Sequence, residues 1–332
     1  MGMVRNWWKL LLAGCVAVWV IKNGGGELYR IPAGQMEGTL LEGDNLLVNK
    51  WSYGLRLPQT PLALPFFHDS IPGTSLKSYV SWLCIPYCRL FSKGVERNDI
   101  VVFNRPDTPN RNIPVDRRKI GVGRCIGLPG DTVCMRDGVL CINGKRVLQP
   151  KEVWVAYLTP DSLEPALCSA LSGMGIPDPG FEQINGFRIR FFPKYRAEAI
   201  VGSTGNGSLL QGIHLKQNNY RVVLPRVNER VTVSRENVHL LYPLLVIHEG
   251  IPVTRVGDRL FMGDKVVKSV RFSQPYYWIA GDHRERATDS RLFGAVPHSH
   301  LIGKGVAVGY SIDPGRSFLD PLRGDRLLKS IE

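Results

Sequence analysis

The sequence has no pair of cysteines in the CxxC spacing, although it contains seven cysteines. This absence argues against a zinc ribbon or a thioredoxin-type redox motif. Acidic residues are few: 29 Asp and Glu stand against 42 Lys and Arg, a net charge of +13 over 332 residues. No repeat with a period of about 20–50 residues is visible, which argues against solenoids and propellers. The basic excess favours an anionic partner, such as nucleic acid, anionic lipid or an acidic protein.

Long apolar runs are also scarce, and the longest lies near the N-terminus. The segment from Leu10 to Ile21 has no charged side chain, and Trp7 and Trp8 precede it. It is shorter than the roughly 17–25 residues of a usual spanning helix, but the flanking Trp side chains suit a membrane interface. We interpret it as an uncleaved membrane anchor. A cleaved signal peptide, a lipoprotein lipidated at Cys15 and a buried core helix are the alternatives.

The remaining sequence predicts a mostly β protein of short antiparallel strands joined by Gly and Pro turns. Residues 54–94 show little periodicity and predict a long irregular excursion. One short helix is expected at 161–171 and a loop at 203–208. Strands are expected at 44–50, 99–103, 120–126, 132–135, 139–142, 186–192, 220–224, 276–280 and 304–310.

Two cysteines flank a hairpin signal. Cys134 and Cys141 are equidistant from Asp137-Gly138, a dipeptide typical of two-residue β-turns. They are therefore expected to face each other across two strands. A disulfide between them is one interpretation, and a pair of small buried hydrophobic side chains is the favoured one.

Four stretches carry a more specific signal. They are Ile31–Leu40, Arg97–Phe103, Gly123–Asp131 and Gly281–Arg291. In this order they resemble the boxes of the bacterial type I signal peptidases, which are membrane-anchored Ser/Lys endopeptidases. The resemblance implies a signal-peptidase-like fold with a groove for an extended signal peptide. It also implies a single-pass protein of the bacterial cytoplasmic membrane, with most of the chain on the extracytoplasmic side.

The resemblance suggests a division of the chain. Residues 1–26 would be the anchor and linker, and 27–145 and 271–318 the two parts of a signal-peptidase-like core. Residues 146–270, where the resemblance is weak, would be a variable β-rich insertion, and 319–332 a C-terminal tail.

The residues that carry the family's chemistry are replaced in this sequence. The resemblance places Gln35 at the nucleophilic Ser and Ala33 at the Ser that donates to the oxyanion. It places Gly123 at the general-base Lys and Ala287 at the Ser that orients this Lys. A Gln amide nitrogen does not attack a carbonyl, Gly offers no base, and the neighbouring Arg124 stays protonated. We therefore expect a relative that has lost peptidase activity.

Other residues offer little replacement. Cys125 shares a strand face with Gly123 and is the one candidate nucleophile, but a small buried thiol is favoured. Lys119 lies about 13 Å from Gly123 by strand geometry, too far to act as the base. Asp289 and Arg291 are expected to hold the last box through a buried ion pair. The retained residues are expected to be structural: Asp289, Arg291, Arg124 and Asp282.

The expected function is binding without cleavage. The partners would be signal peptides, exported or membrane proteins, or an active signal peptidase, with the chain as a regulatory or assembly factor. No cofactor or metal is expected, because His298 and His300 lack ligand spacing and carboxylate neighbours; a solvated loop is expected there. Membrane lipid replaces nucleic acid as the expected anionic partner. An active peptidase using non-standard groups and a structural subunit of an envelope complex are the alternatives.

Overall fold

The computed structural model describes residues 26–31, 36, 39–63, 77–80, 82–108, 112–136, 139–147, 154–184, 187–212, 219–283, 287–313 and 322–331. The expected anchor up to residue 25 and the expected oxyanion and nucleophile positions, Ala33 and Gln35, lie outside these ranges. Within them, no helix is both long enough and apolar enough to cross a membrane.

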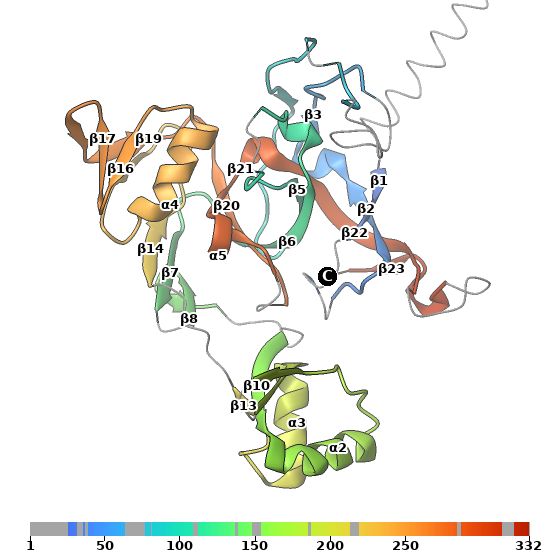
Figure 1. Cartoon of the computed structure of the whole chain (residues 1–332). Coiled ribbons are helices and arrows are strands. Elements are labelled where there is room, and N and C mark those ends of the chain that lie inside the picture. The colour runs from blue at the N-terminus through green and yellow to red at the C-terminus, as the bar shows by residue number, and fades with distance from the viewer. Residues whose placement is uncertain are drawn as a thin grey trace, which may run out of the picture.

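An eight-stranded sheet carries the candidate site (Figure 1). Its strands run in the order β1-β2-β22-β5-β6-β20-β21, and β23 also pairs with β22. The order places β22 between β2 and β5, and β20 beside β6, so segments far apart in the sequence become neighbours. The bounds are β1 Gly26–Arg30, β2 Asp44–Asn49, β5 Ile100–Asn104, β6 Ile120–Gly127, β20 Tyr276–Ala280, β21 Val296–Pro297, β22 Leu301–Ser311 and β23 Lys329–Ser330.

Both faces of this sheet are covered, which explains the continuous apolar runs in its strands. Every residue of β5 is buried, and successive side chains point to opposite faces. Val102 packs in one cluster with Met36 and Leu46, whereas Val101 packs in the other with Tyr53 and Cys125. A strand buried on both faces is expected to lack alternation, and the strands predicted at 99–103, 120–126 and 276–280 are confirmed within one residue.

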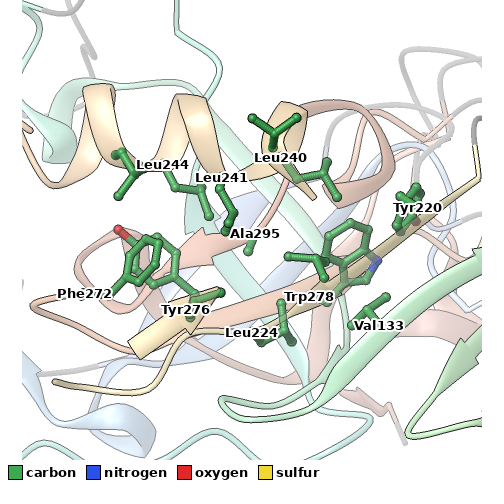
Figure 2. Close-up of a cluster of buried hydrophobic side chains, with 14 of the residues drawn as sticks. Val133, Tyr220, Leu224, Leu240, Leu241, Leu244, Phe272, Tyr276, Trp278 and Ala295 are labelled. Atoms are coloured by element: carbon green, nitrogen blue, oxygen red, sulfur yellow. The ribbon is translucent and has the colours of Figure 1, made fainter. Parts of the chain in front are cut away.

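A second core lies between a helix and the hairpin that follows β6. Its elements are β7 Thr132–Arg136, β8 Val139–Ile142, β9 Lys145–Arg146, β14 Tyr220–Val223, β15 Arg230–Thr232, α4 Val238–Pro243, β16 Thr254–Val256, β17 Arg259–Met262, β18 Lys265–Val267 and β19 Ser269–Arg271. Figure 2 shows leucines of α4 and its continuation, including Leu241 and Leu244, facing the aromatic side chains Tyr276 and Trp278 of β20. Residues 219–272 thus share a core with the hairpin and β20.

Residues 154–212 form a unit with a core of its own. Its sheet has the order β11-β12-β10-β13, and two helices pack beside it (Figure 1). The helices bury Leu167 and Leu171 from α2, and Ala197 and Ile200 from α3. The bounds are β10 Trp154–Pro160, α2 Glu164–Gly173, β11 Glu182–Ile184, β12 Phe187–Pro193, α3 Lys194–Thr204 and β13 Gln211–Gly212.

Helix α3 is not indicated by the sequence pattern. Only Ala197 and Ile200 of its side chains are buried, too few to produce a visible apolar period. The loop expected at 203–208 therefore begins only after Thr204, where Gly205 ends the helix with a φ of 63°. A positive φ at this position is typical of a glycine helix end.

The described parts of the excursion, 54–63, 77–80 and 82–94, are irregular as expected, apart from the short pair β3 Leu55–Arg56 and β4 Arg89–Leu90 and an isolated bridge between Ala63 and Tyr79. It binds the core through guanidinium groups. Arg56 Nη1 donates to the Ser299 carbonyl at 3.1 Å, and Arg89 Nη2 donates to the carbonyls of His298 and Leu301. These bonds satisfy backbone acceptors that a buried turn otherwise leaves without partners.

The expectation of a solvated loop at 298–300 is wrong. His298 and His300 are only 5% and 2% exposed and form a short 3-10 turn before β22. The Arg118 guanidinium lies 3.2 Å from His300 Nε2, and Ser92 Oγ lies 3.0 Å from His298 Nε2. Arg89 and Ser92 of the excursion contact His298. The irregular sequence of the excursion does not indicate where it packs.

The C-terminal segment is part of the core sheet. Strand β23 pairs with β22, and Arg326 forms a two-pronged ion pair with Asp44, with Nη2–Oδ2 at 2.6 Å and Nε–Oδ1 at 3.0 Å. Both side chains are buried, at 9% and 0% exposed. Arg326 Nη2 also donates to the Thr39 carbonyl at 3.2 Å, which links the tail to the first box.

Replacing Arg326 tests this link. Arg326→Ala leaves the Asp44 carboxylate buried without its cation, so we expect a loss of about 3–5 kcal/mol in the free energy of unfolding. Lys329→Ala, at an exposed position on the adjacent strand, is the control and should change little. Urea unfolding followed by tryptophan fluorescence measures both; equal effects would contradict a stabilising role for the tail.

The buried histidines predict an acid-labile fold. Burial, and then Arg89, lower the pKa of His298 to about 4; burial, and then Arg118, lower the pKa of His248 to about 4. In the unfolded chain these pKa values lie near 6.5. The unfolded state therefore binds more protons below about pH 6.5, so stability is retained above that pH and lost as the pH falls toward 4.

The prediction is checked by urea unfolding at pH 7.5 and pH 5. His298→Asn keeps an amide for hydrogen bonding but removes the titrating group. Its loss of stability between the two pH values should be smaller than that of the parent chain by about 1–2 kcal/mol. Identical losses in both proteins would contradict the role of His298.

Candidate functional site

A buried ion pair joins three of the four boxes. Arg124 on β6 meets Asp282 with Nη2–Oδ2 at 2.9 Å and Nε–Oδ1 at 3.1 Å. Thr39, from the first box, donates its hydroxyl to Asp282 Oδ2 at 2.6 Å. Arg124 Nη1 also donates to the Asn98 carbonyl at 3.3 Å, which adds the remaining box. The four stretches recognised in the sequence therefore converge at this point.

The first box is held at both of its described ends. Ile31 N–H donates to the Asp44 carbonyl at 3.2 Å, and the Met36 carbonyl accepts from Thr39 and Leu40 N–H. Ile31 and Met36 are 5% and 1% exposed and pack in the same cluster as Val122 of β6. The ends of the loop that contains positions 33 and 35 therefore lie against the strand that carries the general-base position.

The general-base position has no room for a side chain. A Cβ atom added to Gly123 would lie 2.5 Å from Ile279 Cγ2 and 3.1 Å from the Ala280 carbonyl oxygen. Ile279 is fully buried, and its Cγ2 is fixed to a branched Cβ with little freedom to rotate away. Gly123, which the resemblance places at the general-base Lys, is thus crowded where a side chain would begin.

The last box is stabilised by its own hydrogen bonds. Asp289 pairs with Arg291, with Nη2–Oδ2 at 2.6 Å, and both side chains are buried, at 4% and 8% exposed. Asp289 also accepts from the N–H groups of Gly281 and Arg291, and so caps the short helix α5, Ser290–Phe293. Ala287 is buried and donates its N–H to the His283 carbonyl at 3.0 Å. Asp289 thus links the start of α5 to Gly281, directly after β20.

Cys125 is buried and unreactive by its surroundings. It is 0% exposed, and its thiol donates to the Gly127 carbonyl at 3.6 Å. Burial, and then the nearby Asp99 carboxylate, raise the pKa of this thiol far above its usual range. A thiol that stays protonated is a poor nucleophile.

The structure places one lysine, Lys304, in register with the general-base position. Lys304 on β22 pairs with Val101, which pairs in turn with Gly123, so these residues share a sheet face. Two strand spacings separate the backbones of Lys304 and Gly123 by about 10 Å. The Lys304 ammonium is 2.5 Å from Asp99 Oδ1, and Tyr53 donates to the same carboxylate. This lysine is engaged in a separate ion pair.

The insertion reaches the last box. The Phe191 ring on β12 lies 5.2 Å from the His283 ring, and His283 is fully buried beside Asp282. Thr39, Lys304 and this contact were not singled out in the sequence, because each depends on pairing between distant segments. No cluster of three or more His, Cys, Asp or Glu suited to a metal occurs in the part of the chain described here.

Comparison with known proteins identifies the same family as the four boxes. The family model described as "Signal peptidase, peptidase S26" matches residues 4–166 and 250–310. The chain belongs to the signal peptidase family. The gap in the match falls within residues 146–270, where the resemblance in sequence is also weak.

Individual relatives are signal peptidases I of bacteria. The protein of Rickettsia akari is 32% identical over 43% of this chain and 44% of its own length. That of Buchnera aphidicola subsp. Schizaphis graminum is 25% identical over 89% of this chain and 72% of its own length. The chain thus spans less than half of the Rickettsia relative that it matches.

Among solved structures, the crystal structure of a signal peptidase I from Enterococcus faecalis V583 is 17% identical, with a TM-score of 0.25, and covers 64% of this chain and 97% of its own.

Filling the space at Gly123 should destabilise this signal peptidase homologue. Gly123→Ala brings the new methyl against Ile279, and we expect a loss of about 1–3 kcal/mol in the free energy of unfolding. Gly94→Ala is the matched control, because a Cβ there meets nothing within 4 Å.

A double-mutant cycle separates the contact from other effects. Adding Ile279→Ala to Gly123→Ala removes the clashing Cγ2, so the combined loss should be smaller than the sum of the single losses. Additive losses, measured by urea unfolding, would show that the two side chains do not compete for one space.

Proposed function

We propose that this chain is a signal peptidase homologue that binds signal peptides or exported proteins without cleaving them, as a regulatory or assembly factor. One observation carries the proposal: Gly123 stands at the general-base position, and Ile279 Cγ2 lies 2.5 Å from where its Cβ would be. A Ser/Lys mechanism needs a desolvated lysine beside the nucleophile. Here the lysine is missing and the space at its root is filled.

The contacts that hold the boxes together support the proposal that the chain still binds a peptide. The Arg124–Asp282 pair, the Thr39 hydrogen bond and the Asp289 cap keep the boxes assembled. A peptide that binds as an added strand needs backbone groups and side-chain pockets, but no nucleophile. Loss of cleavage and retention of a binding groove are therefore compatible.

We also propose that the chain is anchored in the bacterial cytoplasmic membrane by its N-terminal segment, with most of its mass on the extracytoplasmic side. Gly26, the first residue of β1, pairs with Asn49. Asn49 is followed directly by Lys50 and Trp51 in the sequence. The Trp51 side chain is 47% exposed beside this entry point. Exposed tryptophan is favoured where a protein meets the membrane interface.

Incubation with a preprotein tests the proposal. The purified full chain in lipid vesicles should leave a preprotein uncut, while a photo-crosslinking amino acid at position 35 should attach to its signal peptide. The same crosslinker at Arg235, whose side chain is 86% exposed, is the control. Specific cleavage at a signal-peptide junction would overturn the proposal in favour of an active peptidase with non-standard groups.

A variant with the family's residues restored tests whether Ile279 excludes a lysine at position 123. We expect no cleavage when the family's four groups alone are restored, by the changes Ala33→Ser, Gln35→Ser, Gly123→Lys and Ala287→Ser. Adding Ile279→Ala creates room for the lysine and should allow cleavage to appear.

The restored variants also separate binding from a purely structural role. A folded five-fold variant that does not cleave, together with no crosslinking from position 35 in the parent chain, would favour a structural subunit that acts through its insertion. The contact of Phe191 with His283 is the observation behind this second candidate, because it brings the insertion to the last box.

A further inference from the structure

A row of four paired residues crosses the sheet β14-β7-β8-β9. Arg221 pairs with Cys134, Cys134 with Cys141, and Cys141 with Arg146. Residues in direct register lie on the same face of a sheet. The sequence predicted the cysteine pair, and the sheet adds an arginine at each end of it. We call these four residues the Arg–Cys–Cys–Arg row.

The row lies on the outer face of its sheet. The neighbours of Cys134 along β7, Val133 and Met135, point inward and are fully buried in the second core. Cys134 and Cys141 themselves are half-buried, and Arg221 and Arg146 are exposed. The two thiols are therefore more accessible than the buried hydrophobic side chains favoured by the sequence.

The spacing of the two cysteines suits a disulfide. Directly paired residues of antiparallel strands have Cα atoms about 4.5 or 5.5 Å apart, depending on the type of pair. Disulfides join Cα atoms roughly 4.4–6.8 Å apart. Both values fall within this range, so the bond requires only rotation of the side chains.

The charge around the thiols selects the kind of reagent. Among the described residues, Arg221 and Arg146 make no ion pair with a carboxylate, and Arg136 lies on the same face as Cys134. Partial burial, and then the Cys141 thiol, raise the pKa of Cys134, while Arg136 and Arg221 act in the opposite direction. Three guanidinium groups disfavour a metal cation and attract an anionic reactant.

We propose that Cys134 and Cys141 form a reversible thiol-modification site that is oxidised by acidic low-molecular-weight disulfides, of which oxidised glutathione is the probe. The thiolate fraction of one protein thiol, smaller but more nucleophilic because of the raised pKa, attacks the glutathione disulfide, whose S–S bond breaks as a mixed disulfide forms and one glutathione leaves. The second protein thiolate then displaces the other glutathione. Two protein thiols are oxidised, one glutathione disulfide is reduced, and the two protons pass to the released thiols.

The bond would join β7 and β8 on the wall of the second core. The inner face of β7 packs in the cluster that contains Trp278 of β20, and β20 leads directly to Asp282. Oxidation would therefore fix the pairing of a hairpin on which part of the site rests. The inference is independent of whether the groove binds a peptide.

The reduced full chain, freed of reductant and incubated with oxidised glutathione, tests the site. Free thiols are then alkylated and the peptides mapped by mass spectrometry. Cys134 and Cys141 should be joined to each other, with two glutathione molecules released. Exposed Cys168 is the internal control, and should stop at the mixed disulfide. Cys134→Ser should leave Cys141 carrying glutathione.

Two results would overturn the proposal: both cysteines still free for alkylation, or both carrying glutathione. The charge requirement has its own test. The double change Arg221→Gln and Arg146→Gln should slow the reaction with oxidised glutathione about three- to tenfold at low salt. It should leave the reaction with neutral hydroxyethyl disulfide unchanged. Arg235→Gln, at an exposed position outside the row, is the matched control. Equal slowing with both disulfides would contradict recognition of an acidic reagent.

Discussion

The ion pair between Arg124 and Asp282 is the constraint on which the site depends. Both side chains are buried, at 9% and 3% exposed, so each charge needs the other and further hydrogen bonds to offset its desolvation. Thr39 and the Asn98 carbonyl provide those bonds. Arg124 is also paired with Ala280 in the sheet, and the same register pairs Ile279 with Cys125, so that Ile279 Cγ2 lies beside Gly123.

This arrangement separates what holds the family's fold from what performs its chemistry. Arg124, Asp282 and Asp289 act on the scaffold through ion pairs and backbone caps, and all are present. The groups that the resemblance predicts to be replaced would act on a substrate, and a side chain at one of these positions, Gly123, would meet Ile279. A fold persists because its packing is satisfied, whereas a function resides in a small set of side chains. Membership of the signal peptidase family therefore does not by itself imply cleavage.

Much of the sheet was predictable because its signals are local. The buried runs of β5, β6 and β20, and the pairing of β7 with β8, follow from strand periodicity and turn signals in the sequence. Helix α3 was missed, since it buries only two side chains. The burial of His298 and His300 was missed because it depends on where an irregular excursion packs, which no periodic pattern encodes.

At the site, the sequence alone provided the four boxes, and the resemblance that they carry predicts that Gln35 and Gly123 supply neither a nucleophile nor a base. That conclusion rests on side-chain chemistry, which needs no coordinates. Only the tertiary structure decided that Thr39 joins Arg124 and Asp282, that Arg326 ties the tail to Asp44, and that Ile279 fills the space beside Gly123. These contacts join strands far apart in the chain, and their register is set by the packing of the whole sheet.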